Sequence, residues 1–260
     1  MKSLYISEVK KELAKYAECT DERITEKDLA PLPEPVQNFF RHGGYLGKVK
    51  MSQAEVQWAE VQFKRSPTTK WMNLTCSQFN SVPKPTRIVY MKSTIGGLFP
   101  FEGRDKYQDG QGNMLIKLLK FIPVANATGK EIDASALVTV LAECFLVPTY
   151  ALQDYISWTA VDSKTAKATI TYHNTKVSGL FYFNDNGEFT HFVTDDRYYS
   201  EKGTEYKKMK WSAVAGNYLE KNGIRMPTYF KAIWHTEKGD YEYFKGTINA
   251  VRPLKIIELK

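Results

Sequence analysis

Cysteine is scarce in this chain: there are three, Cys19, Cys76 and Cys144, and they lie far apart in the sequence. No C-x-x-C pair is present, and any disulfide scheme would leave one cysteine over, which argues against zinc fingers and disulfide scaffolds. Cys144 lies in an apolar run, so we expect it to be a buried and unreactive thiol.

Long apolar runs are also missing. The longest, residues 137–147, contains Glu143, ends at Pro148 and is too short to span a bilayer. The N-terminal segment, MKSLYISEVKKELAKYAE, lacks the apolar centre of a signal peptide and predicts an amphipathic helix instead. We therefore expect a soluble protein without a membrane span, located in the cytoplasm.

Blocks of like charge are absent, although 36 Lys and Arg residues outnumber 29 Asp and Glu residues and give a net charge of +7. Proteins that bind nucleic acid usually gather their basic residues on one face or one helix. Here the basic residues are scattered, so we interpret them as a solvated surface and expect no nucleic-acid partner.

Sequence signatures of the common cofactors and metals are missing too. The chain has no G-x-x-x-x-G-K-[ST] phosphate loop and no G-x-S-x-G nucleophile turn. We expect no cofactor, and we interpret Asp195-Asp196-Arg197 as a turn with an internal ion pair. No metal is expected either, because the histidines lack H-E-x-x-H or H-x-H spacing; they are His42, His173, His191 and His235.

Aromatic residues are plentiful, with 16 Tyr, 14 Phe and 5 Trp. Such residues favour strands and the linings of pockets. Asp109-Gly110 predicts a hairpin turn between strands EGRDKYQ and NMLIKLLKF, and Lys221-Asn222-Gly223 predicts another. The pattern as a whole predicts roughly ten or more antiparallel strands. Runs rich in aromatic and β-branched residues predict strands at 56–64, 71–79, 87–92, 166–172, 176–183, 188–194, 211–219, 225–234 and 241–251.

Helices are predicted in the N-terminal part of the chain and in one segment between the predicted strands. Residues 3–18 and 35–42 show helical spacing or helix-end signals. Residues 131–155 interrupt the strands with a helix that Asp133 or Ser135 could cap and that Pro148 breaks in two. We therefore predict N-terminal helices within 1–44 and a single antiparallel β domain over 45–260, with a helical insertion at 133–155.

The predicted fold is mainly β, in the α+β class. It is a curved antiparallel sheet or half-barrel with helices packed on its concave face. A helix inserted in the middle of such a meander can plug the concave face and leave an apolar cavity between sheet and helix.

Glu143 lies in the apolar stretch Leu-Ala-Glu-Cys-Phe-Leu-Val. A carboxylate there must be paired, protonated or turned toward a cavity. Arg104 and Arg197 are the expected partners, because a guanidinium can hold a carboxylate through two hydrogen bonds. Two interpretations remain open: a structural ion pair between helix and sheet, or a carboxylate that contacts a ligand or transfers protons.

Arg104-Asp105-x-Tyr107 precedes the Asp109-Gly110-x-Gly112 hairpin, whose glycines fit a tight turn. On a strand, Asp105 and Tyr107 face one side and Arg104 the other. Asp105 is therefore a second candidate for a carboxylate that faces the cavity.

The tryptophans lie on or beside predicted strands, and they are Trp58, Trp71, Trp158, Trp211 and Trp234. Large aromatic side chains in such positions can fill a core or line a ligand pocket. Both roles remain open for this set.

The order and spacing of several short motifs resemble a bacterial family of unknown function, over about residues 32–252. Those motifs are Trp71, Arg104-Asp105-x-Tyr107-x-x-Gly110-x-Gly112, Ala142-Glu143 with Pro148, Trp158, Asp196-Arg197, Trp211, Gly223 with Pro227, and Trp234. The family itself implies no activity. Its architecture is similar to the lipoprotein-carrier (LolA-like) half-barrel, and that resemblance implies a fold that holds acyl chains.

Three hypotheses of function follow. The first is a non-enzymatic protein that binds a hydrophobic or amphipathic small molecule, such as a lipid, between sheet and helix. Its expected site comprises Glu143, Arg104, Arg197, Tyr107, Trp71, Trp158, Trp211 and Trp234. The second is a hydrolase-type enzyme that uses Glu143 with Asp105 or a histidine. The third is an interaction module without a ligand.

Overall fold

The computed structural model of this protein describes residues 1–16, 21–95, 98–201 and 203–254. Within these residues, thirteen strands form one antiparallel sheet in the order β6-β5-β4-β3-β2-β1-β15-β14-β13-β10-β9-β8-β7, and two short strands pair separately. The large sheet consists of β1 (Gln53–Phe63), β2 (Met72–Ser81), β3 (Thr86–Ile95), β4 (Phe99–Gln108), β5 (Gln111–Leu118), β6 (Ile122–Ala127), β7 (Ile156–Asp162), β8 (Thr165–Tyr172), β9 (Thr175–Phe183), β10 (Phe189–Thr194), β13 (Trp211–Lys221), β14 (Ile224–Thr236) and β15 (Gly239–Pro253). The separate pair is β11 (Tyr198–Tyr199) and β12 (Lys207–Lys208).

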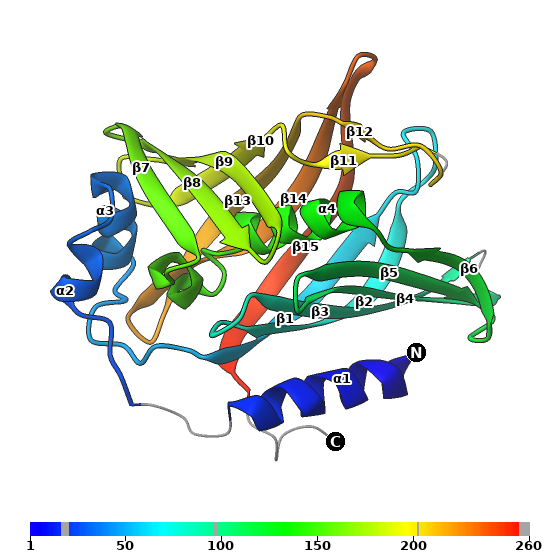
Figure 1. The fold of residues 1–260 in the computed structure, drawn as a ribbon, viewed down its shortest axis with the longest axis horizontal. Coiled ribbons are helices and arrows are strands. Elements are labelled where there is room, and N and C mark those ends of the chain that lie inside the picture. The colour runs from blue at the N-terminus through cyan, green and yellow to red at the C-terminus, as the bar shows by residue number, and fades with distance from the viewer. Residues whose placement is uncertain (17–20, 96–97, 202, 255–260) are drawn as a thin grey trace.

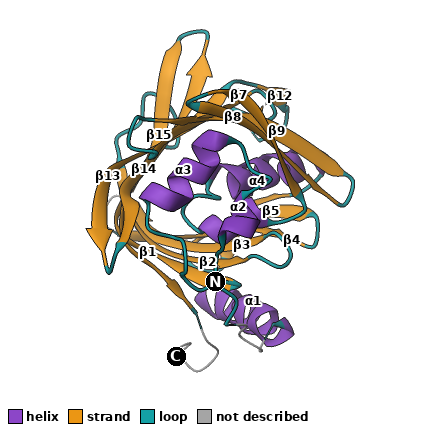
Figure 2. Cartoon of the chain, turned by 90° about the vertical axis from the view of Figure 1, so that its left-hand side faces the viewer, coloured by secondary structure: helices purple, strands orange, loops and turns teal. Residues whose placement is uncertain are grey.

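The sheet curls around helix α4 (Lys130–Ala142), which lies between its two arms (Figures 1 and 2). This helix contacts β4 and β5 on one arm and β8 and β9 on the other. Helices α2 (Glu26–Leu29) and α3 (Glu34–His42) lie at one end of the curl, as Figure 2 shows. The predicted half-barrel with a helix on its concave face is therefore confirmed.

Helix α1 (Lys2–Lys15) lies outside the half-barrel, on the convex face (Figures 1 and 2). Its apolar stripe, which includes Val9 and Leu13, packs on Phe79 of β2 and Ile88 of β3. The predicted N-terminal helix thus forms, although residues 17 and 18 of its predicted range lie outside the described residues. It covers the outer surface of the sheet and takes no part in the concave interior.

Two tight turns form where the sequence predicted them. Asp109 and Gly110 both have positive φ angles, 51° and 81°, and so do Asn222 and Gly223, at 55° and 72°. Two successive residues with positive φ are typical of the type I′ turn, whose twist matches that of two paired antiparallel strands. These turns join β4 to β5 and β13 to β14.

Helix α4 begins earlier than predicted, at Lys130. The two predicted capping residues instead attach the helix to its neighbours: Asp133 accepts a hydrogen bond from the Gly112 N–H at 2.7 Å, and Ser135 Oγ accepts one from the Tyr198 N–H at 3.0 Å. Gly112 is not a turn residue. It allows close approach, since a Cβ atom there would lie 2.5 Å from the Ile132 carbonyl oxygen.

The break in the helical insertion also differs from the prediction. Helix α4 ends at Ala142, well before Pro148, and a short 3₁₀ helix, η1 (Pro148–Leu152), follows. The hydroxyl of Tyr150 in η1 lies 2.8 Å from the Thr86 carbonyl oxygen and 2.9 Å from that of Ser81. These contacts fix η1 against the turn between β2 and β3. Strands β6 and β7, which flank the insertion, were not predicted.

Phe145, in the segment after α4, is the centre of an aromatic core. Its ring centroid lies 4.4 Å from that of Phe39 in α3, and 5.2–5.7 Å from those of four other residues. Those four are Trp158, Phe181, Phe183 and Phe189. Burial and edge-to-face contacts of this kind stabilise the fold beyond the area removed from water. This part of the concave space is therefore filled.

Replacing Phe145 with alanine should lower the free energy of unfolding by about 3–5 kcal/mol, because it leaves a cavity among five other rings. Phe121→Ala is the matched control, since Phe121 is 70% exposed and its loss should change stability by less than about 0.5 kcal/mol. Urea denaturation followed by tryptophan fluorescence measures both. Equal losses from the two variants would contradict the assignment of Phe145 as the core centre.

Candidate functional site

A cavity of about 150 Å³ lies between α4 and the concave face of the sheet. Most of its wall is apolar and includes Phe63, Leu74, Met91, Phe101, Ile116 and Phe244. Its polar groups are Gln78, Arg87, Asp105, Thr139, Glu143 and Arg197. An apolar cavity with a few convergent polar groups is typical of sites that bind small molecules.

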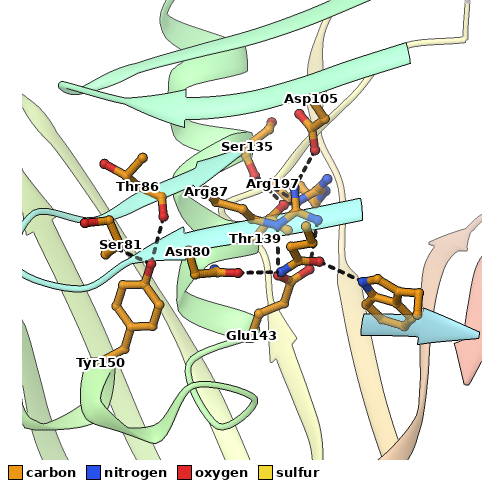
Figure 3. A network of polar contacts seen from close by, with 12 residues as sticks. Asn80, Ser81, Thr86, Arg87, Asp105, Ser135, Thr139, Glu143, Tyr150 and Arg197 are labelled. Carbon is orange, nitrogen blue, oxygen red and sulfur yellow. Dashed lines mark hydrogen bonds and ion pairs between the residues drawn. The ribbon is translucent and has the colours of Figure 1, made fainter. Parts of the chain in front are cut away.

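Glu143, the residue at the C-terminal end of α4, is bound by Arg87 of β3 (Figure 3). Arg87 Nε donates to Glu143 Oε2 at 2.8 Å, and Nη2 donates to Oε1 at 3.0 Å. The third guanidinium nitrogen, Nη1, donates to Asp105 Oδ2 on β4 at 2.7 Å. One arginine therefore holds both candidate carboxylates.

A chain of amide hydrogen bonds continues this network across β1 and β2. Gln78 Nε2 donates to Glu143 Oε2 at 2.7 Å and to Asn80 Oδ1 at 3.0 Å. Gln78 Oε1 in turn accepts from the indole N–H of Trp58 at 3.0 Å. With these bonds, Glu143 has three donors on its two oxygens, which satisfies a buried carboxylate.

Burial of Arg87 by itself would lower its pKa, but the nearby Glu143 and Asp105 carboxylates outweigh burial and raise the pKa above its ordinary value. The guanidinium is therefore charged at all ordinary pH values. The expected partners of Glu143 were Arg104 and Arg197, and that prediction was wrong. Arg87 takes the position because β3 lies beside β4 and places it on the same face as Asp105.

Arg197, between β10 and β11, is the second cation in the cavity. Its Nη1 donates to the Ser135 carbonyl oxygen at 2.8 Å and to Thr139 Oγ1 on α4. Its guanidinium carbon lies 4.5 Å from the ring centroid of Trp211, which is a cation–π contact. Its buried Nε has no hydrogen-bond partner among the residues that the structure describes.

Arg197 also differs from Arg87 in its charge balance. Within the described residues, no carboxylate lies within 4 Å of its nitrogens. The ion pair predicted inside Asp195-Asp196-Arg197 does not form, because Asp196 pairs with Lys208 at 2.8 Å. Arg197 therefore has no direct carboxylate contact in the described chain, although the two arginines and two carboxylates of the cavity balance in formal charge.

Asp105 and Trp211, two further residues selected from the sequence, line the cavity. Arg104 does not, because it points to the convex face. There its Nε lies 3.6 Å from Glu8 Oε2 of α1, and its Nη2 donates to Asn113 Oδ1. The alternation of side chains along β4 separates Arg104 from Asp105, as expected for a strand.

The remaining aromatic candidates lie away from the cavity. Tyr107 is buried in the main core, and Trp158 packs there against Phe181. Trp71 lies in the turn between β1 and β2, between the ammonium groups of Lys64 and Lys245. Trp234 packs beside Trp211. Three of the polar side chains that line the cavity were not selected from the sequence: Arg87, Gln78 and Thr139.

Ser212, His235 and Asp240 are hydrogen-bonded in the same sequence as the Ser-His-Asp triad of a serine hydrolase. Ser212 Oγ lies 2.8 Å from His235 Nε2, and His235 Nδ1 lies 2.7 Å from Asp240 Oδ1. Ser212, however, faces away from the cavity, since its neighbour Trp211 faces into it. Ser212 pairs with both Val193 and Ile233 in mid-sheet, so its local backbone N–H groups are engaged and cannot form an oxyanion hole.

The cavity thiol is not a nucleophile either. Cys76 lines the cavity, and burial raises its pKa to about 12. The pKa of Cys144 is also raised well above its ordinary value by burial. A thiol in this state is protonated and inert near neutral pH. Cys19 lies outside the described residues.

In the ranges that the structure describes, no group of three or more His, Cys, Asp or Glu side chains is placed to hold a metal ion. No helix of the described chain is both long enough and apolar enough to span a membrane.

Replacing Glu143 with leucine should lower the free energy of unfolding by about 3–5 kcal/mol, because Arg87 then loses its main partner inside the fold. The control Glu242→Leu removes a half-buried carboxylate that pairs with Lys231, and should cost less than about 1 kcal/mol. The double variant Arg87→Met with Glu143→Leu should recover part of the loss, which urea denaturation can measure. A double variant as unstable as the sum of its parts would contradict a coupled pair.

Comparison with known proteins gave one family and one structural relative. No curated protein matched the chain. The chain is similar to the crystal structure of a LolA superfamily protein from Nitrosomonas europaea, with 10% sequence identity, a TM-score of 0.45, and coverage of 86% of this chain and 97% of that one. The model of a family of unknown function, DUF6544, matches residues 22–246. The chain therefore belongs to the DUF6544 family, which confirms the family resemblance of its motifs.

Proposed function

We propose that this protein binds a small amphipathic molecule, without catalysis. The apolar part of the molecule lies in the cavity between α4 and the sheet, and an anionic oxygen group lies beside Arg197. The fold that supports this proposal is a half-barrel with a helix on its concave face and an unfilled apolar space between them.

The observation that carries the proposal is the state of Arg197. Its charge has no carboxylate partner in the described chain, and its Nε is a buried donor without an acceptor. A buried donor left unpaired costs free energy, and an oxygen acceptor from a ligand would remove that cost. A carboxylate is the natural complement, because its two oxygens can accept two parallel N–H bonds from one edge of a guanidinium.

Glu143 and Asp105 support binding better than catalysis. Arg87 and Gln78 occupy both oxygens of Glu143, and Arg87 also binds Asp105 Oδ2, so Glu143 is not free to act as a base. A general base must also lie within hydrogen-bond reach of the proton that it removes, and Glu143 is turned toward Arg87 and Gln78 instead. The carboxylates therefore hold α4 in place beside the ligand.

The size of the cavity limits the ligand. An apolar cavity of about 150 Å³ accommodates a benzene-sized group. A longer chain would leave the cavity along the apolar concave surface of β4 and β5, where Phe101 and Ile116 precede Leu118. One linear chain fits this path, and a bulky fused-ring ligand does not.

Dodecanoate and dodecanol test the role of Arg197, because they differ only in their polar end. Arg197→Gln should weaken dodecanoate binding by about tenfold or more and change dodecanol binding little. Arg252→Gln is the control, since Arg252 pairs with Glu55 at the surface. Isothermal titration of delipidated protein gives both affinities. Equal weakening of the two ligands would refute the anionic contact, and failure of both to bind the wild type would refute the proposal.

Gly103→Leu tests whether the cavity is the binding site. Gly103 lines the cavity, and an added Cβ would only touch Met91 at 3.4 Å, so the leucine side chain can enter the empty space. We expect both ligands to lose at least about tenfold in affinity while the protein stays folded. Gly216→Leu places the same side chain where no atom lies within 4 Å of the new Cβ. Unchanged binding in Gly103→Leu would place the site elsewhere.

A further inference from the structure

The described chain exposes five large apolar side chains at one end of the sheet. The beginning of β4 and the turn between β5 and β6 meet there, joined by a hydrogen bond of 2.7 Å from the Leu119 N–H to the Pro100 carbonyl oxygen (Figure 1). The exposed side chains are Leu98 (79%), Phe99 (52%), Phe121 (70%), Ile122 (41%) and Val124 (54%). Apolar side chains that gather in this way mark an interaction surface.

The turn between β1 and β2 extends this surface. Ser93 Oγ of β3 donates to the Asn73 carbonyl oxygen at 2.6 Å, and Ser93 shares a surface hollow with Trp71 and Lys70. Trp71 is itself half-buried between two lysine ammonium groups. We call this surface the rim, and define it as residues 64–71, 92–94, 98–100 and 117–124.

The charge of the rim has one sign. Residues 61–101 and 110–130 contain no Asp or Glu, in a chain with 29 such residues. The rim's cations are Lys64, Arg65, Lys70, Lys92, Lys117 and Lys120. Within the described residues, none of these six lies within 4 Å of a carboxylate. Six of the 36 basic residues thus gather around an apolar tip, and none of the six has an ion-pair partner in the described chain.

We propose that the rim docks on the surface of an anionic lipid bilayer. Aromatic and aliphatic side chains at the tip enter the region of the headgroups, while the surrounding lysines stay at the level of the phosphates. A ring of cations around an apolar tip complements a bilayer, which is anionic outside and apolar below. Protein–protein interfaces are instead depleted in lysine, and five of the six rim cations are lysines.

The position of the rim relative to the cavity adds a second argument. Three cavity residues directly precede or follow rim residues on the same strands: Phe63 before Lys64, Met91 before Lys92, and Phe101 after Pro100. A docked rim would therefore bring the cavity to the lipid surface. Docking itself does not require a filled cavity, so this proposal stands or falls separately from the binding function.

Vesicle flotation with the full chain tests the proposal. The vesicles are phosphatidylcholine alone, or phosphatidylcholine with about a third phosphatidylglycerol. We expect the wild type to float with the anionic vesicles, less so as salt rises, and to bind the neutral vesicles at least about tenfold more weakly. Absence of the wild type from anionic vesicles overturns the proposal, and so does concentration-dependent dimerisation through the rim without lipid.

Matched variants locate the surface. Phe99→Ser with Phe121→Ser should reduce binding to anionic vesicles at least about tenfold. The control, Val161→Ser with Leu219→Ser, removes two side chains that are 54% and 62% exposed elsewhere and should not reduce it. Equal losses in the two double variants would overturn the assignment to the rim.

The charge is tested in the same way. Lys92→Gln with Lys120→Gln should weaken binding to anionic vesicles several-fold and flatten its salt dependence. Lys84→Gln with Lys221→Gln lowers the net charge equally at exposed positions outside the rim and should have less effect. Equal weakening by the two lysine pairs would show a general charge effect and contradict docking by the rim.

The Gly103→Leu variant should retain vesicle binding even if it no longer binds dodecanoate. This variant therefore separates failure of docking from failure of the cavity.

Discussion

The ion pair between Arg87 and Glu143 determines where helix α4 lies in the half-barrel. It joins the end of the helix to β3, and the same guanidinium reaches Asp105 on β4. Separating these two charges inside the fold would cost a large amount of free energy, because each would become a buried charge without a partner. The helix therefore cannot slide along the sheet or turn about its axis, although its apolar surface alone would allow many positions. The shape of the space on either side of the helix follows from that one position.

That space is divided into two parts of different character. On one side, rings from α3, β9 and β10 surround Phe145 and leave no room for a ligand. On the other side, side chains from β1 to β5 and from β13 to β15 line a cavity. The abundance of aromatic residues thus has two explanations, since some rings fill the interior and others line an opening.

The class of fold could be read from the sequence because its signals are local. Alternating apolar residues and turn dipeptides such as Asp109-Gly110 and Asn222-Gly223 depend on near neighbours, and both turns form as predicted. Glu143 could be selected because a carboxylate in an apolar run needs an explanation wherever the run lies. Strand β6 gave no such signal, since it is short and contains a proline.

The partner of Glu143 could not be predicted in the same way, because partnership depends on register between strands. Arg87 begins a predicted strand, and nothing near it in the sequence shows that it will lie beside Asp105, 18 positions away. Arg104 could have been set aside, since alternation along β4 already placed it opposite Asp105. Arg104 was selected because a guanidinium can bind a carboxylate, but its position on the opposite face of β4 excludes it.

Over the part of the chain that the structure describes, the sheet does not close, and β6 and β7 are its two edge strands. An edge strand can recruit a strand from another molecule, and long regular edges lead to aggregation. On β6, Pro123 has no N–H to donate, and the register shifts beside its partner Lys117. Pro123 and its irregular pairing with Lys117 thus interrupt the row of backbone N–H and C=O groups with which a strand of a second chain would pair. They disfavour association through β6 at high concentration.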